Sequence, residues 1–220
     1  MTLTTKLGAS LLATSSIAGL GYAGSKYFEK DTKKVNTVQQ VTTINDLITE
    51  RYDYILLNTS DDGGDQDKWS EKWESYKRAK DNVFNLNGWD ANNARLDLTN
   101  PLKKKCEDLA KEDSAKVSYE NVTKYCARGV TLEEQAKKDT SEVLNTSNSD
   151  HASVWTKRHG EKGQIDAELK KLGMTGDLAN GDAIKSGCNN AKSWNKQVND
   201  YPNVYKAYKR VCTRQTNDPK

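Results

Sequence analysis

The sequence predicts an all-α protein: an N-terminal membrane-spanning or signal helix, followed by two duplicated helical-hairpin units, each closed by a disulfide. Three observations support this fold class. One uncharged segment stands near the N-terminus, apolar residues recur at helical spacing while strand signals are nearly absent, and the chain matches itself when shifted by 82 positions.

The composition limits the classes of function. Charged residues make up 30% of the 220 residues and hydrophobic ones 35%, which excludes a polytopic membrane protein. The formal net charge is only +3, so no strong field argues for a nucleic-acid partner. Five Trp and ten Tyr against two Phe predict a thin core whose large rings carry a polar tip.

The first predicted segment, residues 1–30, is a membrane anchor or a signal segment. The chain carries no charge between Lys6 and Lys26, and residues 7–25 come close to the roughly 20 residues that one membrane-spanning helix needs. Small residues near the end of this stretch suit signal cleavage, and a buried helix of a soluble protein is a third interpretation. We expect residues 7–25 to contact the membrane.

Residues 31–66 are predicted to form a juxtamembrane helix and an acidic Gly/Asp linker. Thr43 and Asp46 form a capping-box pattern at the start of a helix that the apolar spacing extends over residues 44–57. The Asp- and Gly-rich run at residues 61–67 fits a solvated linker. Because carboxylates cluster there, weak cation binding is the alternative.

The rest of the chain is predicted as helical repeat 1, residues 67–148, and helical repeat 2, residues 149–220. Apolar residues share one helical face in each repeat, and capping pairs such as Thr131 with Glu134 open helices. The apolar faces are Trp69, Trp73 and Tyr76; Leu102, Cys106 and Leu109; and Ile165, Leu169 and Leu172. Core packing, rather than a cofactor site, explains these stripes.

Internal repetition is the most informative feature of the sequence. The shift by 82 positions superimposes rare residues and a Tyr-x-Asn-Val-x-Lys string. The matched pairs are Trp73 with Trp155, Lys80 with Lys162, Leu96 with Leu178, Lys103 with Lys185, Cys106 with Cys188, Tyr119 with Tyr201, Asn121 with Asn203, Val122 with Val204, Lys124 with Lys206 and Arg128 with Arg210. We interpret the match as a duplication of one helical unit.

Each repeat holds two cysteines at positions that suit a helix hairpin, in which residues equidistant from the turn face each other. Cys106 and Cys126 are symmetric about one polar stretch, and Cys188 and Cys212 about another, although Cys212 lies one helical turn beyond the position that matches Cys126. Four cysteines allow three connectivities, among which the sequence does not choose, and buried free thiols are the alternative. Without a Cys-x-x-Cys motif we predict no metal site.

No catalytic residues are predicted. His151 and His159 have no Ser or Cys nucleophile motif beside them, so the sequence indicates no enzyme and no cofactor. Trp89 and Trp194 lie in polar surroundings and are the candidate contacts with a partner. The alternative for either ring is packing against its own hairpin.

The layout of the chain also resembles that of a known group of proteins. The N-terminal segment MTLTTKLGASLLATSSIAGLGYAGSKY precedes a polar helical body with the strings YENVTKYC and YPNVYKAYKRVC. This layout resembles the large paralogous families of short, uncharacterised, N-terminally anchored proteins of haemotropic mycoplasmas. The resemblance implies an anchored protein of the bacterial surface that is antigenically variable or touches the host cell. It implies no catalytic or binding residues.

Two arguments about sidedness disagree. The lysines after residue 25 favour a body inside the cell, whereas disulfides require an oxidising space. We give the cysteines priority and predict a single-pass protein of the cell membrane with its body outside the cell. Its predicted function is a non-enzymatic surface module that contacts an unknown protein or cell-surface partner. A secreted or tethered binder of a small ligand or cation, held between the repeats, is the alternative, and a hydrolase of unfamiliar type is the least favoured.

Overall fold

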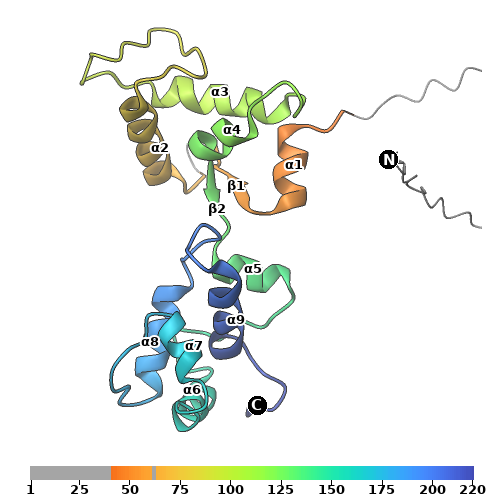
Figure 1. Cartoon of the computed structure of the whole chain (residues 1–220), viewed down its shortest axis with the longest axis vertical. Coiled ribbons are helices and arrows are strands. Elements are labelled where there is room, and N and C mark those ends of the chain that lie inside the picture. Colours follow the sequence, from red (N-terminus) through yellow and green to blue (C-terminus); the bar gives the residue numbers. More distant parts are fainter. Residues whose placement is uncertain (1–40, 61–62) are drawn as a thin grey trace, which may run out of the picture. The chain divides into compact units, whose positions relative to one another are not determined.

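The computed structural model describes residues 41–60 and 63–220, and helices dominate this part of the chain (Figure 1). Residues 7–25, the predicted anchor, lie outside it. The described elements are α1 (Ile44–Arg51), β1 (Tyr54–Leu56), α2 (Gln66–Ala79), α3 (Thr99–Lys111), α4 (Tyr119–Cys126), β2 (Ala127–Gly129), α5 (Leu132–Lys138), α6 (Ala152–Gly160), α7 (Asp166–Lys171), α8 (Gly181–Ala191) and α9 (Tyr201–Cys212). The mostly helical prediction is confirmed for these residues. None of these helices has both the length and the apolar character of a membrane span.

A short antiparallel pair of strands corrects the all-α prediction. β1 pairs with β2, with Leu56 opposite Ala127. The helix predicted over residues 44–57 ends at Arg51, because Tyr52 adopts the left-handed conformation with φ 51° and turns the chain. Strands of three residues are too short to show the alternation of apolar and polar residues from which strands are predicted.

Buried apolar side chains form two clusters, which define two units of the fold. The first cluster lies between Ile44 and Cys126, and the second between Leu132 and Cys212. We call the part of the chain that contributes to the first cluster unit 1, which ends with β2. Unit 2 contains the second cluster and begins before α5.

These units do not coincide with the predicted repeats at residues 67–148 and 149–220. α1 precedes the first predicted repeat, yet its Ile44 and Ile48 are buried in the core of unit 1. α5 falls within the first predicted repeat, yet its Leu132 is buried in the core of unit 2. A repeat defined only by matched Trp and Cys residues therefore begins too late.

A disulfide closes the helix pair of each unit, as predicted. Cys106 in α3 is bonded to Cys126 at the end of α4, and Cys188 in α8 to Cys212 at the end of α9. The helices of each pair pack against each other (Figure 1). α9 has 12 residues where α4 has 8, and this additional helical turn explains the late position of Cys212.

The second cysteine of each disulfide also receives the same backbone hydrogen bond in both units. The amide of Leu57 donates to the carbonyl of Cys126 at 2.9 Å, and the amide of Leu144 donates to the carbonyl of Cys212 at 3.0 Å. The segment after the first helix of each unit is therefore fixed to the end of the disulfide-bonded helix.

Tryptophan positions recur too, but not as the shift by 82 positions predicts. The indole N–H of Trp69 donates to the carbonyl of Asn58 at 2.6 Å, and that of Trp155 donates to the carbonyl of Asn145 at 3.3 Å. The structural counterpart of Trp155 is therefore Trp69 and not Trp73.

The first helix of each unit begins with a predicted capping box. In α1 the Thr43 hydroxyl accepts from the amide of Asp46, whose carboxylate accepts from the amide of Thr43. In α5 Thr131 and Glu134 make the same reciprocal pair of bonds. Because each box satisfies amides that the helix leaves unpaired, it fixes the start of α1 and of α5.

Candidate functional site

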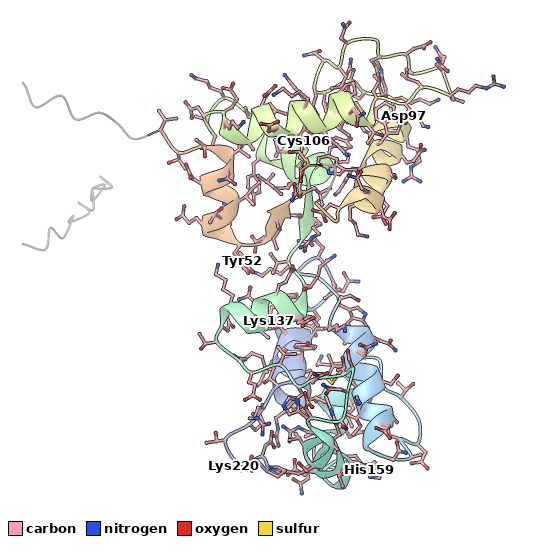
Figure 2. The ribbon with its side chains drawn as sticks, turned by 180° about the vertical axis from the view of Figure 1, so that it is seen from behind. Tyr52, Asp97, Cys106, Lys137, His159 and Lys220 are labelled. Carbon is pink, nitrogen blue, oxygen red and sulfur yellow. A yellow bond between two sulfur atoms is a disulfide. The ribbon has the colours of Figure 1, made fainter. Side chains whose placement is uncertain are left out.

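The disulfide of unit 1 lies along an open groove of about 430 Å³, which we call groove 1. It is lined by Thr43, Asn45, Leu56, Leu57, Asn58, Thr59, Cys106, Glu107, Ala110, Lys111 and Cys126. Leu56, Leu57 and the disulfide supply its apolar surface, and Cys106 is labelled in Figure 2. Glu107 and Lys111 form an ion pair at 2.7 Å on its α3 side, and both side chains are exposed.

A second groove occupies the corresponding place in unit 2, and we call it groove 2. Its volume is about 310 Å³, and it is lined by Glu133, Lys137, Val143, Leu144, Asn145, Thr146, Ser147, Lys192, Tyr208 and Cys212. The correspondence follows from the shared backbone bond, since Leu144 and Cys212 take the places of Leu57 and Cys126. Figure 2 labels Lys137, which lies on α5 beside this groove.

Larger side chains narrow groove 2. Tyr208 stands four residues before the second cysteine of its disulfide, where unit 1 has Val122, which is buried and does not line groove 1. Lys192 stands four residues after the first cysteine, where unit 1 has Ala110. The same backbone framework therefore carries an open groove in unit 1 and a partly filled one in unit 2.

The charge beside the two grooves differs as well. Glu133 pairs with Lys137 at 2.6 Å beside groove 2. Burial raises the pKa of Tyr208, and the nearby carboxylate of Glu133 raises it further. Asn45 stands at the place of Glu133 in groove 1, two residues after the capping threonine, and it is neutral.

The predicted partner contacts Trp89 and Trp194 are half-buried against their own units. The ring of Trp89 lies edge-on to Trp73 and Tyr76, with centroid distances of 6.0 and 5.3 Å. Trp194 packs against the core of unit 2. Neither ring lines groove 1 or groove 2. This packing favours the alternative interpretation of both residues, and their contact with a partner stays a prediction.

The two histidines make local bonds to the backbone. Nδ1 of His151 accepts from the amide of Asn145 at 2.7 Å, and Nε2 of His159 donates to the carbonyl of Leu178 at 2.8 Å. His151 thereby helps to hold the Asn145 segment along groove 2.

Within the described part of the acidic run at residues 61–67, Asp65 makes a structural hydrogen bond to the backbone. The carboxylate of Asp65 accepts from the amide of Asn58 at 2.8 Å, whereas residues 61–62 lie outside the description. Over residues 41–60 and 63–220, no three His, Cys, Asp or Glu side chains gather in a way that could hold a metal ion.

The grooves were missed by the sequence prediction, although a signal for them exists. The tetrapeptide Leu-Asn-Thr-Ser occurs at residues 57–60 and again at 144–147. In both copies the Asn side chain accepts from the amide two residues later, at 2.9 and 2.8 Å. The first three residues of the first copy and all four residues of the second line their groove, so this repeated tetrapeptide locates the two sites.

Comparison with known proteins gives no relative from which a function can be transferred. No protein-family model matches the chain, and neither a curated protein nor a solved structure matches it. The function has to be argued from the disulfides and the two grooves.

Proposed function

We propose that the chain is a non-enzymatic module of the cell surface, anchored in the membrane through residues 7–25, with two disulfide-closed helical units that contact a protein or cell-surface partner. The pair of buried disulfides at corresponding positions carries this proposal. Disulfides persist in oxidising spaces such as the cell exterior and are rare in the cytosol. They therefore support a body outside the cell, against the inside position that the flanking lysines favour.

The recurring contacts also support an origin by duplication. Disulfides, capping boxes, the Trp–Asn bond and the Leu–Cys bond all occur once in each unit, in the same order along the chain. The resemblance to surface proteins of haemotropic mycoplasmas agrees with a tethered module, and it stays a prediction.

Disulfide mapping tests the observation on which the proposal depends. Native protein is isolated with its free thiols blocked, digested without reduction, and analysed by mass spectrometry. We expect linked peptides that join Cys106 to Cys126 and Cys188 to Cys212. Four blocked, unlinked cysteines would contradict the proposal, since the argument for an oxidising space would be lost.

Proteolysis of intact cells tests the sidedness directly. We expect an added protease to cleave the body on intact cells, while a cytoplasmic protein of the same cells stays whole. Cleavage only after lysis would place the body inside and overturn the proposal. The intact mass of the native protein separates an uncleaved anchor from a cleaved signal segment.

Binding of a small ligand is the second candidate function, and the volume of groove 1 favours it. Ligand pockets commonly measure about 300–1,000 Å³, a range that includes the 430 Å³ of groove 1. This groove lies within unit 1, and not between repeats as predicted. Calorimetry with calcium and a panel of metabolites tests this function, for which a saturable heat is expected.

A further inference from the structure

The sequence contains two Asn-Gly pairs, and the structure places them in different surroundings. They are Asn87 with Gly88 in unit 1, and Asn180 with Gly181 in unit 2. An asparagine before a glycine is chemically labile, because glycine has no Cβ that keeps its amide nitrogen away from the preceding side chain. That nitrogen can attack Cγ of the Asn side chain if the backbone is free to bring the two atoms together.

Asn87 and Gly88 form the exposed tip of a turn in the segment that joins α2 to α3 (Figure 1). The amide of Trp89 donates to the carbonyl of Leu86 at 3.3 Å, and Gly88 has φ 78°, which glycine adopts without strain. The side chain of Asn82 accepts from the amide of Leu86 at 2.7 Å and donates to its carbonyl at 3.0 Å. The base of the turn is therefore held, whereas its tip is exposed to solvent.

The tip itself is not restrained by the rest of the described chain. Neither the side chain of Asn87 nor the amide of Gly88 makes a hydrogen bond with any residue among 41–60 and 63–220. Apart from its two neighbours in the chain, no atom lies within 4 Å of the place that a Cβ of Gly88 would take. Rotation of the backbone that brings the Gly88 nitrogen to Cγ of Asn87 therefore breaks no hydrogen bond of either residue.

The pair in unit 2 is held at both residues. Asn180 is the N-cap of α8, and its side chain accepts from the amide of Ala183 at 3.1 Å. A Cβ on Gly181 would lie 2.7 Å from backbone atoms of Trp155, so Gly181 packs closely against α6. Attack on Cγ of Asn180 requires loss of the cap and separation of Gly181 from α6. Loss of the cap by itself is expected to slow the reaction about fivefold.

We propose that Asn87 is a site of spontaneous deamidation in the folded chain, and that the fold protects Asn180. The Gly88 nitrogen forms a bond to Cγ of Asn87, and the side-chain nitrogen leaves as ammonia together with the proton of the Gly88 amide. Water then opens the resulting succinimide ring at either carbonyl and gives aspartate or isoaspartate. The product carries a new negative charge two residues before Trp89, a predicted partner contact. This inference goes beyond the proposed function and does not depend on it.

The test incubates the full chain, with its disulfides intact, at neutral pH and follows both sites over time. Peptide mapping by mass spectrometry quantifies aspartate and isoaspartate at each of them. We expect these products to form at Asn87 at least about fivefold faster than at Asn180. In urea the cap and the packing of Gly181 are lost, so the two rates should become similar.

Asn87→Gln is the control variant, because its longer side chain would have to close a larger ring, which forms slowly. It should lose the product at this position and keep the slow reaction at Asn180. Equal or faster reaction of Asn180 in the folded chain would overturn the proposal, and so would a folded chain whose Asn87 stays intact while the chain in urea reacts. An unchanged preference for Asn87 in urea would also overturn it, since the neighbouring sequence and not the fold would then explain the selectivity.

Discussion

The two units place the same backbone bonds around cores of different chemistry. The core of unit 1 contains five buried aromatic side chains, whereas the core of unit 2 contains two and is otherwise mostly aliphatic. The buried aromatic residues are Trp69, Trp73, Tyr76, Phe84 and Tyr125 in unit 1, and Trp155 and Tyr208 in unit 2. The capping boxes, disulfides and backbone bonds are the shared part, so these fixed points, rather than the identity of the core residues, maintain the common framework.

A buried ion pair is an electrostatic difference between unit 2 and unit 1. In unit 2 the guanidinium of Arg158 contacts the carboxylate of Asp218 at 2.8 and 2.6 Å, and neither side chain is exposed. In unit 1 the residue at the corresponding place, three positions after Trp69, is Lys72, which donates to the carbonyl of Lys124 at 2.8 Å. Among residues 41–60 and 63–220, no carboxylate is paired with Lys72 in the way that Asp218 is paired with Arg158.

Loss of this carboxylate is the change with the largest expected effect. We expect Asp218→Ala to lower the free energy of unfolding by about 3–5 kcal/mol, because it leaves the buried Arg158 charge without its partner. Urea unfolding followed by circular dichroism measures the loss. Asp177→Ala is the control, since its pair with Lys162 has a 90% exposed carboxylate and should contribute less than about 1 kcal/mol. If the two variants lowered the free energy of unfolding equally, burial of the Arg158–Asp218 pair would not increase its contribution to stability.

The disulfides allow the most direct comparison between units. Replacing both cysteines of either disulfide with Ala should lower the free energy of unfolding by about 3 kcal/mol. The two losses should be similar, because the disulfides close loops of similar length, with sequence separations of 20 and 24. The variants are Cys106→Ala with Cys126→Ala, and Cys188→Ala with Cys212→Ala. Urea unfolding should give nearly equal losses. A much smaller loss in one unit would contradict this expectation and show that its reduced chain keeps structure when unfolded.

The sequence predicts that a disulfide can close each hairpin, although it does not choose among the three connectivities, and it does not predict the extent of the units. Cys106 and Cys126 could be paired because symmetry about a turn is a local property of a hairpin. The role of α1 and α5 could not be found from the shift by 82 positions, because the offset between the units changes along the chain. It is 86 between Trp69 and Trp155, but 82 between the first cysteines.

Insertions of about one helical turn produce these changes of offset. Unit 1 has the longer segment between its tryptophan and its first cysteine, whereas unit 2 has the longer segment between its two cysteines. A single fixed shift of 82 therefore misses most of these structural correspondences. The repeated Leu-Asn-Thr-Ser marks where the grooves lie, but their size was beyond prediction, because it depends on how side chains such as Ala110, Lys192 and Tyr208 fill the space around a shared framework.

The smallest expected effect concerns the capping boxes, which differ in one respect. In unit 2 the Arg128 guanidinium also contacts Glu134, at 2.9 and 2.7 Å. Burial by itself raises the pKa of Glu134, but hydrogen bonds from Arg128 and Thr131 outweigh it and lower the pKa to about 2. In unit 1 the pKa of Asp46 is lowered by its hydrogen bonds with Thr43 alone.

The lowered pKa of Glu134 predicts a loss of stability in acid. Because the folded pKa lies below the ordinary value of 4.5, the stabilisation is complete above that value and is lost as the pH falls toward about 2. With its side chain 30% exposed, solvent screening limits the contribution to about 1 kcal/mol at most. Unfolding measured between these pH values should show a shallower decline in Glu134→Gln than in the unchanged chain, while Asp46→Asn changes the slope less. An unaltered slope in Glu134→Gln would mean that the contact with Arg128 does not stabilise the charged carboxylate.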